Sequence, residues 1–189
     1  MKIKIDYKIL IIVCILALTK QIPIYLLFML FTFIHELGHI IVAKLLGQKI
    51  YLINILPIGS SVNLGINIDD YNIKVKKGRL INLKKFIIAL AGPLTSILIA
   101  IIIMCINKNA VYLIYTNLLI GLFNLLPIYP LDGEQFLRNI LKLFKGMKKA
   151  NNIANIVSYT TLVILTVITS IIILKWHNIA IIVVILYLW

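Results

Sequence analysis

The pentapeptide His35-Glu36-Leu37-Gly38-His39 contains the side chains whose types and spacing are best suited to chemistry. On a helix, residues four apart share one face, so both imidazoles can reach one zinc ion. Glu36 lies beside them, where its carboxylate can accept a proton from an attacking water. The other interpretation, simple packing of these side chains between helices, is weaker because ionisable groups are costly inside a membrane. The motif predicts one zinc ion per chain, held by His35 and His39, with Glu36 as the catalytic acid/base.

Catalytic zinc usually takes three protein ligands, and Asp132 is the best candidate for the third. It follows Pro127 and Pro130, which break the helix and let the chain fold back at membrane depth. Asp132 could instead be a helix N-cap, with Gln135 completing a capping box. Glu134, the only later glutamate, would be the ligand in a different class of membrane zinc protease.

The elements that must position these residues are apolar to a degree that is typical of membrane proteins. The chain has 189 residues, of which 62% are hydrophobic and only 13% are charged, and its mean hydropathy is +1.06. A soluble domain would be about half apolar and about a quarter charged. The excess falls in runs that approach the roughly 20 residues needed to cross a bilayer.

Six apolar runs predict an all-α polytopic membrane protein with about six transmembrane helices. Turn residues around Leu56–Ser61, with strand-like alternation beside them, predict a short re-entrant β-like hairpin near residues 50–66. The first and last runs are short for a span and could be half-spans. The six runs are Ile9–Leu18, Ile22–Ala43, Phe86–Ile106, Ala110–Leu126, Ile153–Leu174 and Ile179–Trp189.

Basic residues between the runs predict the orientation of the chain. If the N-terminus is cytoplasmic and all six runs cross, only three of the 19 basic residues lie outside: Lys20, Lys108 and Lys175. We therefore expect both termini in the cytoplasm. The first run has no A-x-A cleavage site after it, so we interpret it as a retained anchor.

The net charge of +13 is explained by these topology-determining loops, which could also contact anionic lipid headgroups. A nucleic-acid partner is not expected, because the chain has no basic module interleaved with aromatic residues.

Three motifs together resemble the site-2 protease family of intramembrane metalloproteases. They are the HELGH sequence in an apolar run, Ala91-Gly92-Pro93, and the segment from Asn124 to Gly133, NLLPIYPLDG. Within that family the pattern is most similar to the group of the stage IV sporulation protein FB, which is also short and has about six spans. The resemblance covers roughly residues 22–145.

The resemblance implies a role for each matching residue. It makes His35, His39 and Asp132 the zinc ligands and Glu36 the catalytic residue, and it assigns substrate placement to Asn124 and Pro130. Asn124 could equally form an interhelical hydrogen bond. The hairpin, with Gly59 and Ser60, would pair with an unwound substrate as an added strand. Two positions depart from the pattern: Ser60 replaces a frequent glycine, and Ser96 replaces a frequent asparagine.

We therefore expect a single intramembrane metalloprotease domain over residues 1–189, with a catalytic core at about 22–145 and extra membrane segments at 1–21 and 153–189. Its partners would be the lipid bilayer and a membrane-associated protein substrate, such as a sporulation pro-sigma factor, and could include a membrane regulatory protein. The alternatives are a protease with another substrate, a non-enzymatic metal-binding or transport protein, and a catalytically silent relative. Transporters usually show inverted repeats, and the sequence has none.

Overall fold

The helix α3 lies at the centre of the fold and contacts three other helices. The structure, a computed structural model, describes residues 2–5, 22–56, 59–65, 75–176 and 188. In chain order the described elements are β1 (Lys2–Ile5), α2 (Ile22–Leu45), β2 (Lys49–Leu56), β3 (Gly59–Gly65), α3 (Val75–Ile106), α4 (Val111–Asn124), α5 (Asp132–Lys145) and α6 (Met147–Trp176).

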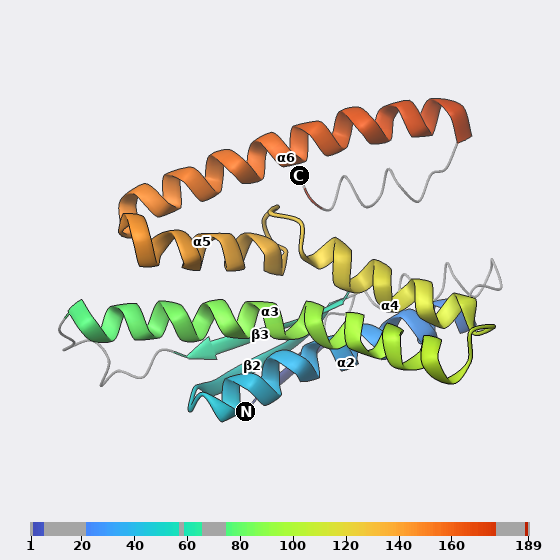
Figure 1. Cartoon of the computed structure of the whole chain (residues 1–189), viewed down its shortest axis with the longest axis horizontal. Helices are drawn as coiled ribbons and strands as arrows, with labels where there is room; N and C mark the ends of the chain where they lie inside the picture. Colours follow the sequence, from blue (N-terminus) through green and yellow to red (C-terminus); the bar gives the residue numbers. More distant parts are fainter. Residues whose placement is uncertain (1, 6–21, 57–58, 66–74, 177–187, 189) are drawn as a thin grey trace.

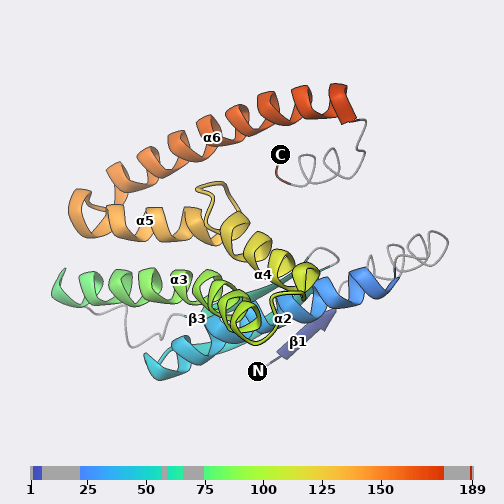
Figure 2. The same ribbon diagram turned by 45° about the vertical axis from the view of Figure 1, so that its right-hand side comes forward.

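The helices are arranged in layers around α3. Helices α2, α4 and α5 each pack against α3, and α6 turns back along the outer side of α5 (Figure 1). The sheet lies beside α2, where β3 is in contact with that helix. The rotated view shows β1 on the side of the sheet away from α5 and α6 (Figure 2). This arrangement places the middle of α2 next to the middle of α3, where the predicted histidines and the Ala91-Gly92-Pro93 motif lie.

Three described helices are long and apolar enough to cross a membrane: Ile22–Leu45, Gly78–Ile106 and Met147–Ile171. The predicted fourth span is the shorter helix Val111–Asn124. Helix α3 begins at Val75, earlier than the predicted start at Phe86, so the basic stretch before the span is partly helical. The first and last apolar runs lie almost entirely outside the described residues, so the count of six spans stays a prediction.

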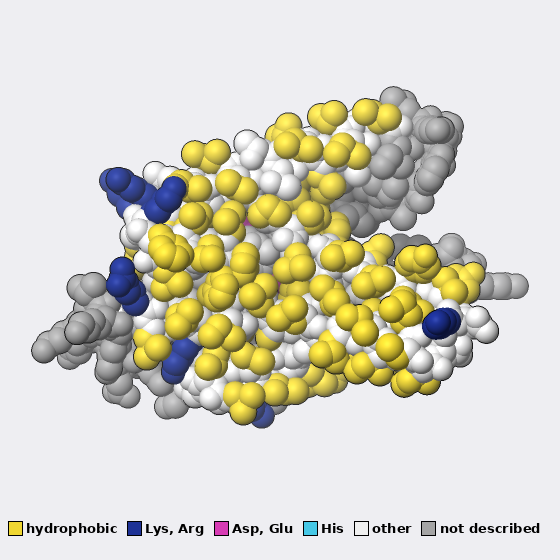
Figure 3. Space-filling view, viewed as in Figure 1, with side chains coloured by type: hydrophobic (Ala, Val, Ile, Leu, Met, Phe, Trp, Pro, Cys, Tyr) yellow, Lys and Arg dark blue, Asp and Glu magenta, His cyan; other side chains and the backbone are white. Residues whose placement is uncertain are grey.

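Side chains on the outside of these helices suit a lipid environment. Large apolar residues are exposed along α2, α3, α4 and α6, including Ile24, Tyr112 and Ile171 at 70%, 86% and 63%. Hydrophobic side chains are spread over most of one face, and most of the Lys and Arg side chains drawn there lie towards its left-hand end (Figure 3). A broad apolar surface with cations outside it is the pattern expected of a bilayer-spanning protein.

The strands form one three-stranded sheet in the order β1-β2-β3. Strands β2 and β3 pair antiparallel, with Leu56 opposite Gly59 next to the turn. Strand β1 pairs parallel with β2, from Lys2 opposite Leu52 to Ile5 opposite Ile55. The sequence predicted a hairpin in this region within an otherwise all-α protein but did not predict β1. That the hairpin re-enters the membrane stays a prediction.

Close contacts between backbones bring the helices near enough for side chains to meet. A Cβ added to Gly38 on α2 would lie 2.5 Å from Thr95 Oγ1 on α3. A Cβ added to Gly133 on α5 would lie 2.1 Å from the carbonyl oxygen of Leu125, just after α4. A larger residue would displace the Thr95 side chain at the first position and the backbone after α4 at the second. The first contact sets the distance between α2 and α3, and the second places the start of α5 against the end of α4.

Candidate metal centre

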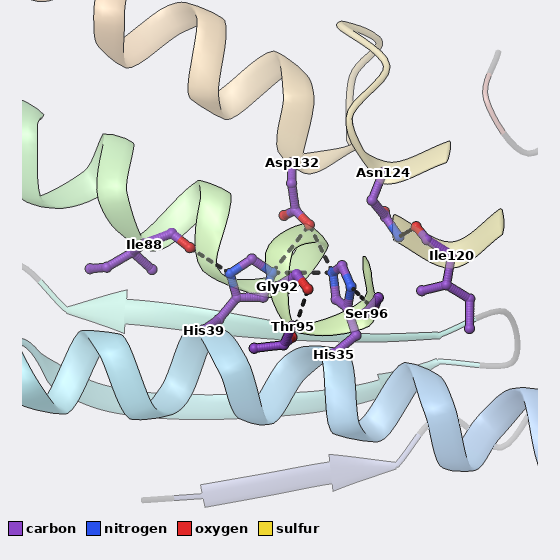
Figure 4. A network of polar contacts seen from close by, with 9 residues as sticks. All are labelled: His35, His39, Ile88, Gly92, Thr95, Ser96, Ile120, Asn124 and Asp132. Carbon is purple, nitrogen blue, oxygen red and sulfur yellow. Dashed lines mark hydrogen bonds and ion pairs between the residues drawn. The ribbon is translucent and has the colours of Figure 1, made fainter. Parts of the chain in front are cut away.

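Three side chains from two helices meet at one point (Figure 4). His35 and His39 come from α2, one turn apart, and Asp132 is the first residue of α5. The Nε2 atoms of His35 and His39 lie 2.9 and 3.1 Å from Asp132 Oδ2, and 3.3 Å from each other. Both histidines are buried, with 4% and 6% of their surface exposed. The predicted ligand set therefore converges inside the protein.

The geometry and chemistry of this donor set fit a zinc ion. Ligand atoms bound tetrahedrally at about 2.0–2.1 Å from zinc lie roughly 3.3 Å from one another, close to the separations found here. Space is also available beside the donors, because Gly92 has no side chain: an added Cβ would lie 2.1 Å from His39 Nε2 and 2.6 Å from His35 Nε2. Two imidazole nitrogens and a carboxylate, which together lie within 4.8 Å, are ligands typical of catalytic zinc.

The two alternatives for Asp132 do not match the structure. The N-cap of α5 is Leu131, and no side chain caps this end of the helix, so the capping box with Gln135 is not formed. Glu134 is buried at 2% exposure, but its Oε1 atom accepts a hydrogen bond from Arg138 Nε at 2.6 Å. Asp132, and not Glu134, therefore faces the histidines.

Electrostatics keep the Asp132 carboxyl ionised. Burial by itself would raise its pKa, but the imidazoles of His35 and His39 beside the carboxylate outweigh burial and lower the pKa to about 2. An ionised carboxylate is the form that binds a metal cation. Its position in the first turn of α5 adds a favourable interaction with the partial positive charge of the helix N-terminus.

The other ring nitrogen of each histidine is also held, by residues of α3 that sequence reasoning did not assign to the site. His39 Nδ1 lies 2.7 Å from the carbonyl oxygen of Ile88, and His35 Nδ1 lies 3.0 Å from Ser96 Oγ. Ile88, Gly92 and Ser96 are spaced by four residues, so they lie on one face of α3. This spacing was the available signal, but it becomes informative only once α3 is known to face α2.

Glu36 lies on α2 beside the histidines and is partly buried. It is close enough to His39 and Asp132 to interact electrostatically with both. Glu36 is not a member of the ligand cluster, so its carboxylate remains available to accept and return protons next to the metal.

The predicted substrate contacts lie on three parts of the chain: the end of α4, the segment before α5, and β3. Asn124 lies at the end of α4 near the site, and its Nδ2 donates to Ile120 O at 2.9 Å within its own helix, not across to another helix (Figure 4). Pro130 is exposed in the segment that leads to Asp132. Gly59 and Ser60 begin β3, opposite Leu56 and Ile55 of β2.

The family of the chain follows from a match over most of its length. A model of peptidase family M50 matches residues 23–110 and 106–168, which include every ligand candidate. The chain belongs to peptidase family M50. The resemblance to site-2 proteases is confirmed by a solved site-2 protease from Methanocaldococcus jannaschii, with a TM-score of 0.69 and 29% identity, covering 98% of this chain and 86% of that one.

Two curated relatives agree with this assignment. A zinc metalloprotease of Methanocaldococcus jannaschii is 39% identical over 142 residues, which are 69% of this chain and 38% of the relative. Stage IV sporulation protein FB of Bacillus subtilis is 30% identical over 127 residues, which are 64% of this chain and 41% of the relative. The M50 chain thus spans about two fifths of the length of these relatives. The first relative is named as a zinc metalloprotease, which agrees with the predicted cofactor.

Proposed function

We propose that this M50 chain is an intramembrane zinc metalloendopeptidase that hydrolyses a peptide bond of a membrane-associated protein. The convergence of His35 Nε2, His39 Nε2 and Asp132 Oδ2 within 3.3 Å of one another carries the proposal. Support comes from the position of both histidines in a helix long and apolar enough to cross a membrane. Family membership and the likeness to a solved site-2 protease point the same way.

Each member of the site has a distinct role in this proposal. His35, His39 and Asp132 hold one zinc ion, which supplies Lewis acidity to polarise the scissile carbonyl and activate water. Glu36 accepts a proton from the attacking water and returns it to the leaving amine, so that one carboxylate acts first as base and then as acid. Burial of the histidines strengthens these electrostatic effects, because little solvent screens them.

Substrate binding is assigned to the residues around the ligands. A transmembrane substrate helix hides its carbonyl groups in its own hydrogen bonds, so it must unwind before cleavage. The hairpin with Gly59 and Ser60 would accept the unwound segment as an added strand; β3 supports this role because it lies at an edge of the sheet and contacts α2. Asn124 and Pro130 would place the scissile bond near the metal, and the Asn124 amide would help to stabilise the oxyanion.

The remaining parts of the proposal concern the whole chain. Residues 1–189 form a single domain with its catalytic core at about 22–145 and additional membrane segments at 1–21 and 153–189. About six spans place both termini in the cytoplasm of a bacterial cell. The substrate would be a sporulation pro-sigma factor, in keeping with the similarity to stage IV sporulation protein FB, and a membrane regulatory protein would control access.

Replacement of Glu36 by glutamine tests the proposal directly. The amide that replaces the carboxylate cannot accept a proton, so we expect Glu36→Gln to retain zinc but to lose at least about 100-fold of the cleavage rate, the lower end of general acid–base contributions. Wild type and variant would be co-expressed with candidate membrane-tethered pro-proteins, with cleavage followed by immunoblot and zinc by metal analysis of the purified chains. Cleavage by Glu36→Gln at the wild-type rate would refute the catalytic role. Zinc binding without cleavage of any candidate by wild type would favour a non-enzymatic metal protein.

A further inference from the structure

The two candidate zinc ligands of α2 are oriented by chemically different partners. His39 Nδ1 faces the carbonyl oxygen of Ile88 at 2.7 Å. A carbonyl oxygen can only accept, so Nδ1 must carry the hydrogen. In a neutral imidazole this leaves the lone pair on Nε2, the atom that faces Asp132. The backbone of α3 therefore determines which nitrogen of His39 can bind a metal.

His35 has a side chain as its partner in place of a backbone carbonyl. Its Nδ1 lies 3.0 Å from Ser96 Oγ, and Ser96 is 1% exposed while His35 is 4% exposed. At that burial, bulk water cannot replace the hydroxyl. A hydroxyl can donate or accept, so the contact holds the imidazole in place in either tautomer. Only the arrangement in which Ser96 accepts leaves the His35 Nε2 lone pair available to a metal.

Packing fixes the position of the Ser96 hydroxyl. Ser96 lies four residues after Gly92, so both residues lie on the face of α3 that is turned towards the ligands. Helix α4 closes the opposite side, where a Cβ added to Gly121 would be 3.3 Å from Ser96 Cβ. The neighbouring hydroxyl, Thr95 Oγ1, donates instead to the carbonyl of Gly92 within its own helix. Ser96 is therefore the described hydroxyl that contacts a candidate ligand.

We propose that Ser96 is a positioning residue of the metal centre. Its hydroxyl accepts a hydrogen bond from His35 Nδ1 and so directs the His35 Nε2 lone pair to the metal, as the Ile88 carbonyl does for His39. The inference rests on the proposed ligand set, and it adds a residue that touches neither metal nor substrate. It also gives a physical role to Ser96, which stands where many members of the family have asparagine.

Zinc affinity of the full chain in detergent tests this inference independently of proteolysis. Loss of a hydrogen bond that orients a ligating histidine typically weakens metal binding by about 10–100-fold, and we expect this for Ser96→Ala in competition with a chromophoric chelator. Ser96→Thr keeps a hydroxyl at the same atom and should recover most of the affinity. The matched control is Ser170→Ala, because the exposed Ser170 hydroxyl bonds only to Val167 O of its own helix.

A spectroscopic signature separates positioning from a general loss of structure. With cobalt(II) in place of zinc, the ligand-field absorption of Ser96→Ala should differ from that of wild type, while Ser170→Ala should match wild type. Thermal unfolding of the metal-free proteins should show Ser96→Ala folded.

The outcomes distinguish this inference from the proposed function. Wild-type zinc affinity and an unchanged cobalt spectrum in Ser96→Ala, together with loss of metal in His35→Ala, would overturn the role of Ser96 and leave the ligand set intact. Wild-type affinity in both His35→Ala and Asp132→Ala would refute the ligand set itself. Weaker binding by Ser96→Ala that Ser96→Thr restores would support the inference.

Discussion

Asp132 and Glu134 lie in the same turn of α5, yet their carboxylates serve two different regions of the molecule. Asp132 faces two histidines from a helix more than 90 residues earlier in the chain. Glu134 faces Arg138, whose guanidinium also donates to Asn155 Oδ1 of α6 at 2.9 Å. The first region brings together α2, α3 and α5 around donors with room for a cation. The second region joins α5 to α6 through the positively charged side chain of Arg138.

The difference lies in how each buried carboxylate is compensated. A buried charge is costly unless it is paired and hydrogen-bonded. Glu134 has a permanent partner in Arg138, so its region is complete without a ligand. Asp132 is paired with the imidazoles of His35 and His39, and these are also the side chains with which zinc is most often bound. One turn of helix thus separates a carboxylate suited to function from one suited to structure.

Replacement of each carboxylate by alanine should give the largest contrast. Asp132→Ala removes a direct ligand, so its loss of zinc affinity should exceed the roughly 100-fold upper range for orienting residues, and cleavage should become undetectable. Glu134→Ala should bind zinc within about a few-fold of wild type, because it is not in the ligand cluster. Zinc titration of both purified variants measures the contrast, and retention by Asp132→Ala with loss in Glu134→Ala would reverse the assignment.

The local part of this site could be predicted from the sequence, because it depends on short spacings. His35 and His39 share a helical face by periodicity alone, and their apolar surroundings identify a membrane helix. The third ligand required more information. Two prolines and the family resemblance favoured Asp132, but an N-cap role for Asp132 and ligation by Glu134 both remained possible. The structure decides between them because α5 begins beside the histidines.

The parts that could not be predicted depend on long-range packing. The Ile88 carbonyl leaves no mark in the sequence, since any residue type supplies one. Ser96 was recognised only as a departure from a family pattern. Strand β1 pairs with a strand some 50 residues later, and Lys2–Ile5 reads equally well as a basic tail before an apolar run. Such pairings depend on the positions of whole elements, which local periodicity does not determine.

A methyl group placed beside the donors tests whether the region around Asp132 needs open space to bind zinc. In Gly92→Ala the new Cβ would lie 2.1 Å from His39 Nε2, so α2 and α3 must separate or the ring must turn. We expect zinc affinity to fall by at least about 10-fold, as when a ligand loses its orientation. Gly78→Ala is the control on the same helix, because nothing lies within 4 Å of its added Cβ. Equal zinc affinities for the two variants would mean that the space at Gly92 is not needed for the metal.

Removal of the Arg138 guanidinium tests the second region, around Glu134. Arg138→Met leaves Glu134 buried without its partner, which should cost about 3 kcal/mol of unfolding free energy, the lower end for a broken buried pair. Unfolding in mixed micelles with increasing SDS measures this cost. The double variant with Glu134→Gln should recover part of it, because no buried charge remains. A loss under about 0.5 kcal/mol would show that the pair behaves like an exposed one.

A smaller loss of stability is expected at another contact of α6, which joins it to the segment before α5. The Tyr129 N–H donates to Ser158 Oγ at 2.8 Å, and Ser158 is 8% exposed, so alanine there leaves the Tyr129 N–H without this acceptor. Ser158→Ala should cost about 1 kcal/mol, typical of one neutral hydrogen bond, in the same unfolding measurement. Ser170→Ala, whose hydroxyl bonds only within α6, should change stability much less. Because this segment ends at Asp132, a fall in zinc affinity in Ser158→Ala as large as in Gly92→Ala would show that α6 helps to place the ligand, and that the two regions are coupled.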